Sequence, residues 1–185
     1  MDLMSQETWK FINTFAPWLA AVGTLMAVGV SLYLARQDKR VRLNITAGYR
    51  VIVSQGMQGK PPGVMAIRIV NVGHREAQIT GIGWKVGLIK KQHAEQMTIQ
   101  GDGISSPLPK RLRDGDEAVY YFPMDGKQKW LEGFVAKLLL PYPKWKLRNT
   151  KVGIFTSVGK TFEARIEKGL RCELLKYIET TKNDN

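Results

Sequence analysis

A run of 25 residues without a formal charge, residues 11–35, dominates the start of the chain. An α-helix rises 1.5 Å per residue, so about 20 apolar residues cross a hydrocarbon core roughly 30 Å thick. Trp9 and Trp18 near the start of the run and Tyr33 near its end suit the aromatic belts at the two membrane interfaces. The sequence therefore predicts one transmembrane helix over residues 11–35.

A buried core helix and a cleaved signal peptide are two other interpretations of this run. A core helix rarely continues this far without a charge, and a signal peptide begins with a basic segment. Residues 1–10 instead hold Asp2 and Glu7 beside Lys10, and no A-x-A cleavage site is evident. We therefore expect an uncleaved anchor that follows a short extracytoplasmic N-terminus, residues 1–10.

The basic residues that flank the run predict its orientation. Lys10 alone precedes the run, whereas a basic linker, residues 36–41, follows it. The basic residues on this side are Arg36, Lys39, Arg40 and Arg42. Because basic segments resist translocation, we expect a single-pass protein of the cell inner membrane, with the N-terminus outside and the following domain in the cytoplasm. The single cysteine, Cys172, is compatible with a reducing compartment.

Residues 42–181 have the pattern of a mainly β domain, because short β-branched segments alternate with turn signals. The expected strands are residues 41–54, 64–73, 77–89, 94–99, 117–122, 152–156 and 161–166, and the expected helices are residues 125–140 and 168–180. The order of elements does not alternate between strand and helix, which argues against a doubly wound parallel sheet. The predicted fold is a transmembrane helix followed by an immunoglobulin-like β-sandwich with one or two added helices. Residues 182–185 are expected to form a disordered tail.

Two segments, NVGHREAQITGIGW and LRDGDEAVYYFP, carry a resemblance to known proteins. They resemble a pattern found in short, functionally unassigned bacterial and phage proteins with an N-terminal membrane span. In those proteins an N-x-G turn joins two sandwich strands, and a basic loop with an acidic tip precedes a strand. The resemblance covers about residues 65–123. It implies a membrane-anchored β-domain and transfers no catalytic residue.

The segment SVGKT, residues 157–161, looks like the end of a phosphate-binding P-loop. That motif requires a glycine at position 154, where this chain has Ile154, and it must lead into a helix. The residues that follow, TFEARI, favour a strand. We therefore expect a hairpin turn at residues 157–160.

The remaining chemical candidates are an acidic cluster, two histidines and one cysteine. Asp114, Asp116 and Glu117 lack the ligand spacing of a calcium loop, and Asp-Gly is a common turn pair. A hydrolase that uses these three carboxylates would also need a further member of the site, which the sequence does not supply. We expect His74 and His93 to be surface residues and Cys172 to be a small packing residue. No catalytic residue, metal site or cofactor is predicted.

The charge of the chain is strongly positive, with 28 Lys and Arg against 16 Asp and Glu, a formal net charge of +12. No acidic residue occurs from Phe134 to Phe162, where aromatic and basic residues alternate. Such a segment suits the headgroup zone of an anionic leaflet, although nucleic acid and plain solvent are alternatives. The residues expected to contact lipid are Arg36, Lys39, Arg40, Arg42, Lys144, Trp145, Lys146, Arg148 and Lys151.

These patterns together predict a non-catalytic, single-pass membrane protein whose cytosolic β-sandwich is an interaction or scaffolding module in contact with anionic phospholipid headgroups. The alternative is a membrane-tethered nucleic-acid-binding factor of phage or host-defence type. Small residues recur at Ala16, Ala20 and Thr24, which leaves a homo-oligomer open. The sequence does not identify a protein partner.

Overall fold

The computed structural model describes residues 3–38, 40–53, 59, 61–87, 91–97, 104–124 and 130–183. The chain divides into two compact units, Met1–Arg40 and Val41–Asn185. The second unit is called the β-domain below. Each unit is described by itself.

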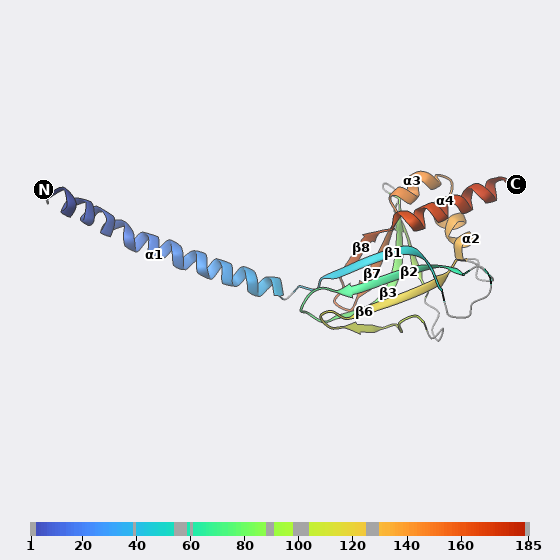
Figure 1. The fold of residues 1–185 in the computed structure, drawn as a ribbon, viewed down its shortest axis with the longest axis horizontal. Helices are drawn as coiled ribbons and strands as arrows, with labels where there is room; N and C mark the ends of the chain where they lie inside the picture. Colours follow the sequence, from blue (N-terminus) through green and yellow to red (C-terminus); the bar gives the residue numbers. More distant parts are fainter. Residues whose placement is uncertain are drawn as a thin grey trace. The chain divides into compact units, whose positions relative to one another are not determined.

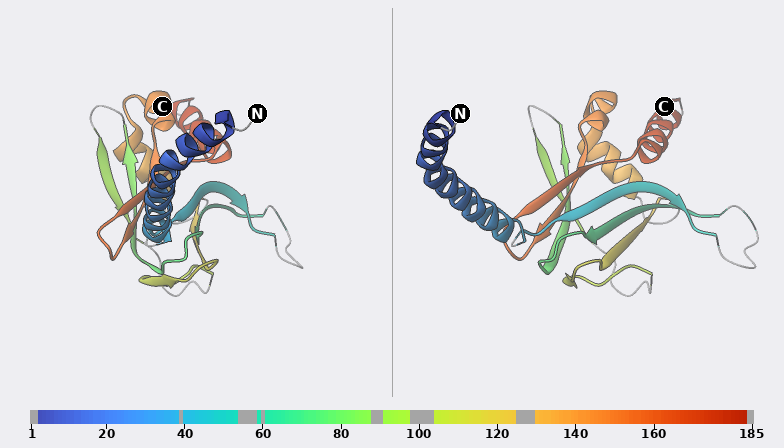
Figure 2. Two further views of the ribbon diagram at one scale, coloured as in Figure 1. Left: turned by 90° about the vertical axis from the view of Figure 1, so that its left-hand side faces the viewer. Right: turned by 60° about the vertical axis from the view of Figure 1, so that its left-hand side comes forward.

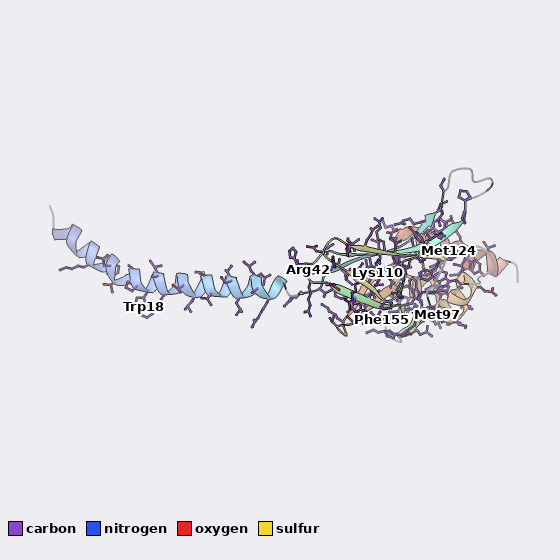
Figure 3. The ribbon with its side chains drawn as sticks, turned by 90° about the horizontal axis from the view of Figure 1, so that it is seen from below. Trp18, Arg42, Met97, Lys110, Met124 and Phe155 are labelled. Carbon is purple, nitrogen blue, oxygen red and sulfur yellow. The ribbon has the colours of Figure 1, made fainter. Side chains whose placement is uncertain are left out.

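The first unit is one helix, α1 (Leu3–Asp38), drawn in blue in Figure 1. Its stretch from Asn13 to Arg36 is 24 residues long, apolar enough to cross a membrane, and not buried against any other part of the chain. Trp18, which projects from α1 in Figure 3, is 72% exposed. The expectation of one long apolar helix is confirmed, and the helix extends beyond residues 11–35 at both ends.

The first sheet of the β-domain has three antiparallel strands in the order β1-β2-β6. These strands are β1 (Leu43–Val51), β2 (Gly63–Asn71) and β6 (Glu117–Pro123). Met65, Ile67 and Ile69 alternate along β2 and are fully buried, as the two-residue period of the sequence predicts. The other face of this sheet carries more polar side chains, including Thr46 and Arg68, which are paired across β1 and β2.

The second sheet has the strand order β4-β3-β7-β8, and a short strand, β5, also pairs with β3. Its strands are β3 (Ala77–Val86), β4 (Gln92–Gln96), β5 (Lys110–Leu112), β7 (Lys151–Thr156) and β8 (Thr161–Arg165). The hairpin of β7 and β8 confirms the turn expected at residues 157–160, and Gly159 in it has a φ of +72°. Strand β5 lies where the sequence analysis expects no strand, because its backbone pairs with β3, about 30 residues earlier in the chain.

Both sheets contribute to one hydrophobic core. Ile67 and Tyr120 from the first sheet and Ile79, Val152 and Ile154 from the second are all fully buried in it. Burial raises the pKa of Tyr120 to about 12, because a phenolate would be poorly solvated there. The β-domain therefore consists of two antiparallel sheets with added helices. This confirms the predicted mainly β class with added helices.

Four helical segments complete the β-domain, and Figure 2 shows the orange and red helices gathered on one side of it. They are α2 (Trp130–Phe134), the π-helical segment η1 (Val135–Leu139), α3 (Pro143–Arg148) and α4 (Lys168–Asn183). The expected helix at residues 125–140 is found from Trp130 onward, and residues 125–129 lie outside the described part. The α4 helix buries Leu170 and Leu174 as its periodicity predicts, and it continues to Asn183, into the expected tail.

One expectation about this region is wrong, and one helix was not expected. The unexpected helix is α3, which Pro143 begins, because a proline is well suited to the first turn of a helix. Cys172 was expected to pack inside, yet it is exposed on α4.

Candidate functional site

The basic segment at residues 144–151 is built into α3 and the start of β7, and two of its cations have structural roles. The ammonium group of Lys146 donates to the carbonyls of Leu138 (3.0 Å) and Leu140 (2.7 Å) and to Oε1 of Gln92 (3.1 Å). It thereby satisfies carbonyls at the end of η1 that lack helical partners. Lys146 is therefore committed to holding α3 against η1.

Lys151 has a different structural role, because it forms an ion pair with Glu163. Its Nζ atom lies 2.9 Å from Oε2 of Glu163, whose other carboxylate oxygen accepts a hydrogen bond from Lys85. The hydrogen bonds from Lys85 and Lys151 lower the pKa of Glu163. This ion cluster joins β3, β7 and β8 on the outer face of the second sheet.

The solvent-facing side chains of α3 and of the residues just before it form a small basic and apolar surface, which we call the α3 surface. Trp145 in it is 44% exposed. The exposed members of the α3 surface are Lys137, Leu140, Tyr142, Lys144, Trp145 and Arg148. Its composition matches the sequence-based expectation of cations beside amphipathic aromatic side chains.

A second basic surface surrounds Arg42. The carbonyl of Arg42 accepts a hydrogen bond from the backbone N–H of Val72 (2.9 Å), which ties the start of β1 to the turn after β2. Figure 3 places Arg42 at one end of the β-domain and Met124 toward another. The turn that connects β2 to β3, residues 72–76, therefore lies beside Arg42.

Asn71 holds the neighbouring turn, residues 113–116, against the turn at residues 72–76. Its backbone N–H donates to the carbonyl of Asp116 (3.0 Å), and its carbonyl accepts from Gly115 (2.9 Å). Its side-chain amide donates to the carbonyls of Arg75 (2.9 Å) and Leu112 (3.0 Å). The sequence marks Asn71 only as the start of an N-x-G turn, whereas the structure makes it the fully buried centre of two turns.

A third turn, residues 157–160, reaches the same region from the second sheet. The N–H of Ser157 donates to the carbonyl of Gln78 (3.0 Å), the second residue of β3. Since β3 begins directly after the turn at residues 72–76, all three turns gather where β3 starts. We call Arg42 and these three turns the Arg42 end.

The Arg42 end combines exposed apolar tips with an excess of basic side chains. Val72 is 54% exposed and Val158 is 51% exposed. The basic residues of the Arg42 end are Arg42, Arg75, Arg113 and Lys160, with Arg111 on the adjoining strand β5, and its acidic residues are Glu76, Asp114 and Asp116. Apolar tips beside cations are the composition expected of a surface that enters a headgroup layer.

The acidic residues at this end already have partners. Asp114 Oδ2 lies 2.8 Å from Nδ1 of His74, and Oδ2 of Asp116 accepts the backbone N–H of Arg113 (2.9 Å). Glu76 lies 3.8 Å from Arg111. The predicted turn at the acidic cluster is confirmed, with Gly115 at a φ of +78°.

Glu117, the third member of the predicted acidic cluster, belongs to β6 and pairs with Arg68 at 3.4 Å. Among the residues that the structure describes, no three His, Cys, Asp or Glu side chains are close enough together to hold a metal ion. His74 and His93 are exposed, as expected for surface histidines. His74 has the carboxylate partner Asp114, which the sequence did not indicate.

Within the β-domain, the structure does not bring Arg42 together with the expected lipid-contacting residues around α3. Strand β3 runs from the Arg42 end to Lys85, which is paired with Lys151 near α3. Ten strand residues span about 30 Å at roughly 3.3 Å each. Arg42 and the α3 surface therefore lie at opposite ends of the strands of the second sheet. Arg36 and Arg40 belong to the first unit, and Lys39 lies outside the described residues.

In the part of the chain that the structure describes, the outer face of each sheet carries a groove. The groove on the second sheet has a volume of about 300 Å³, with Gly83 and Gly153 in its floor and Phe155 on its wall. A Cβ atom on Gly83 would lie 2.9 Å from Cε2 of Phe155, so the glycine is needed for the ring to lie across the strands. Glu95 and Glu163 also line this groove.

The groove on the first sheet, of about 710 Å³, contains Arg50 and Arg68. Arg50 is held by a bidentate pair with Glu167 at 2.7 and 2.9 Å, which raises the pKa of Arg50 and lowers the pKa of Glu167. Because Glu167 immediately precedes α4, this pair clamps β1 to that helix. Arg50 therefore has a structural role in this groove.

Comparisons with known proteins give only distant matches. No protein-family model matches this chain, and no curated protein matches it at a significant level. Among solved structures it is similar to a Bordetella pertussis protein provisionally named ApaA, with 16% identity and a TM-score of 0.33 over 70% of this chain and 91% of that chain. It is also similar to a Northeast Structural Genomics Consortium target, with 13% identity and a TM-score of 0.29 over 72% of this chain and 91% of that one. At these scores neither neighbour transfers an activity or a ligand to this chain.

Proposed function

We propose that this chain is a single-span membrane protein whose β-domain is a non-catalytic interaction module in contact with anionic phospholipid. The observation that carries the proposal is the helix from Asn13 to Arg36, which is apolar, long enough to cross a membrane, and unburied. Leaving a Leu, Phe or Met side chain in water forgoes roughly 1.5–3 kcal/mol of burial. A bilayer removes that cost for the whole stretch at once.

The proposed topology has the N-terminus outside and the β-domain in the cytoplasm, in a cell inner membrane. The concentration of basic residues directly after the span, Arg36 to Arg42, supports this orientation. The proposed β-domain is immunoglobulin-like in the broad sense of two facing antiparallel sheets. Loops and strand edges of such sheets supply binding surfaces in many proteins.

The absence of catalysis is also a proposal. It is supported by the state of the acidic cluster, in which Asp114 and Asp116 are engaged by His74 and by a backbone N–H. Carboxylates held in this way fix the turn at residues 113–116. The proposed module has a protein partner that the sequence does not identify, and the small residues of α1 are the proposed surface for self-association.

Membrane insertion is tested by alkaline carbonate extraction of membranes from cells that make the full chain. We expect the protein to stay in the pellet, and Leu25→Lys, which places a charge in the span, to move a large fraction to the supernatant. A charge at the centre of a span costs about 2.5–3.5 kcal/mol, so the expected shift is more than tenfold. The matched control Leu25→Ala should remain in the pellet.

Orientation is read from reporters fused at either end of the same chain. Alkaline phosphatase should be active at the N-terminus, and a fluorescent protein should fold at the C-terminus. Release of the unsubstituted protein by carbonate, or the reverse pattern of reporters, would contradict the proposal.

The second candidate function is nucleic-acid binding, favoured by the groove on the second sheet. Phe155 offers an aromatic face there, and Lys85 and Lys151 lie on the same outer surface. Glu163, which is paired with both lysines, and Glu95, which also lines the groove, oppose nucleic-acid binding because they place negative charge there. Filter binding of the detergent-solubilised chain at low and high salt discriminates between the two functions, since phosphate contacts give steep salt dependence.

A further inference from the structure

We propose that the Arg42 end is the surface through which the β-domain docks on the anionic leaflet, with Val72 and Val158 entering the interface. This inference deepens the proposed function and rests on the anchor being inserted. It differs from the expectation based on sequence, which placed the contact both at the basic residues around Arg42 and at the basic segment around α3.

Chain length favours the Arg42 end over the α3 surface. Arg42 follows Arg36, the end of the candidate span, by six residues, so it lies at most about 20 Å from that point even if the linker is extended. The α3 surface lies at the other end of β3, about 30 Å farther along the strands. Headgroup charge is screened beyond roughly 8 Å at physiological salt. The Arg42 end is thus the surface that the covalent connection keeps within reach.

Charge complementarity supports the same end. The three acidic residues there are occupied by His74, Arg111 and a backbone N–H. The ammonium group of Lys160, at the end of the turn at residues 157–160, lies 4.8 Å from the ring centre of Phe162 in β8. Arg42, Arg113 and Lys160 are all exposed and come from three separate segments, so together they can meet several headgroups.

The apolar tips are presented on fixed turns. Asn71 pins the turns at residues 72–76 and 113–116, and the N–H of Ser157 pins the third turn to β3. Docking through Val72 and Val158 therefore requires no rearrangement of the backbone. Valine side chains of this kind bury little area each, so the contact should be reversible and dependent on charge.

The test uses the full chain reconstituted into vesicles of phosphatidylcholine alone or mixed with phosphatidylglycerol. Cys172→Ser removes the single cysteine, which is exposed. Val158→Cys or, as the matched position at the α3 surface, Tyr142→Cys then carries an environment-sensitive fluorophore. Quenching by lipids labelled near the headgroup reports contact.

We expect the label at position 158 to shift to the blue and to be quenched in anionic vesicles, and much less in neutral ones. The label at position 142 should be unaffected in both. Quenching of the label at position 142 to an equal or greater extent, or no effect of phosphatidylglycerol on the label at position 158, would overturn the inference. If carbonate releases the reconstituted chain, the anchor proposal itself fails, so the two failures are distinguishable.

Matched charge variants provide the second readout. Arg42→Gln, Arg113→Gln and Lys160→Gln together should reduce docking of the label at position 158 about a hundredfold, because each basic residue at an anionic surface is worth roughly fivefold. Lys137→Gln, Lys144→Gln and Arg148→Gln remove the same charge from the α3 surface and should leave the signal unchanged. Equal losses from the two triple variants would show a nonspecific effect of net charge and overturn the assignment.

Discussion

Asn71 is the residue on which the geometry of the Arg42 end depends most. It is fully buried, and its side chain serves Arg75, Leu112 and Gly73 at once. A buried amide of this kind can replace three missing backbone partners, which no apolar side chain of similar size could do. The N-x-G pattern predicts the turn, but the contact with Leu112 is 41 residues away in sequence.

Asn71→Ala should lower the free energy of unfolding by about 2–4 kcal/mol, because it leaves two carbonyls and one N–H without their partners. Asn44→Ala, at an exposed position of β1, is the matched control and should change it by less than about 0.5 kcal/mol. Urea unfolding of the chain in detergent, followed by tryptophan fluorescence, measures both. Equal effects of the two substitutions would contradict a central role for Asn71.

At the scale of elements, the ion cluster of Lys85, Lys151 and Glu163 joins three strands of the second sheet. The folded-state pKa of Glu163 is lowered by both lysines. A carboxylate with a lowered folded pKa stabilises the fold above its unfolded pKa of about 4.5, and that stabilisation is lost as the pH falls through the folded pKa. The cluster should therefore matter at neutral pH and not in acid.

Glu163→Gln should reduce the stability of the β-domain by about 1 kcal/mol at pH 7, and the difference from the unsubstituted protein should shrink below pH 4.5. Glu95→Gln, on the opposite edge strand β4, removes the same charge at an exposed position outside the ion cluster and should reduce the stability at pH 7 much less. Thermal unfolding followed by circular dichroism at several pH values provides the comparison. A difference that persists unchanged at pH 3 would contradict the ionic explanation.

Elements whose apolar residues recur with a strong period could be predicted from the sequence. Elements that depend on tertiary contacts could not. The alternation of Met65, Ile67 and Ile69 and the stripe of Leu170 and Leu174 both mark faces that are buried in the structure. Strand β5 and helix α3 carry no such period, since β5 depends on pairing with β3 and α3 on the hydrogen bonds of Lys146. The candidate site could not be predicted for the same reason. The Arg42 end brings together turns from distant parts of the sequence, and the turns at residues 72–76 and 157–160 are more than 80 residues apart.

At the scale of the whole molecule, the β-domain has a hydrophobic core of its own. Among the residues that the structure describes, the buried members of this core cluster all lie between Ala47 and Leu174, and none of them belongs to α1. The core includes Tyr120, Trp84 and many aliphatic side chains from both sheets, which gives the β-domain a hydrophobic centre of its own. Its stability should therefore not depend on the attached helix.

Limited trypsin digestion tests this independence and the topology together. Trypsin cleaves after Arg36, Lys39, Arg40 and Arg42, so treatment of inside-out membrane vesicles should release a fragment that begins between Gln37 and Leu43. We expect that fragment to resist further digestion and to unfold cooperatively on heating, because its core is complete. Intact right-side-out spheroplasts should protect the same sites. Rapid digestion of the released fragment to small peptides would show that the β-domain needs the anchor to stay folded. Release of the fragment from right-side-out spheroplasts would place the β-domain on the opposite side of the membrane.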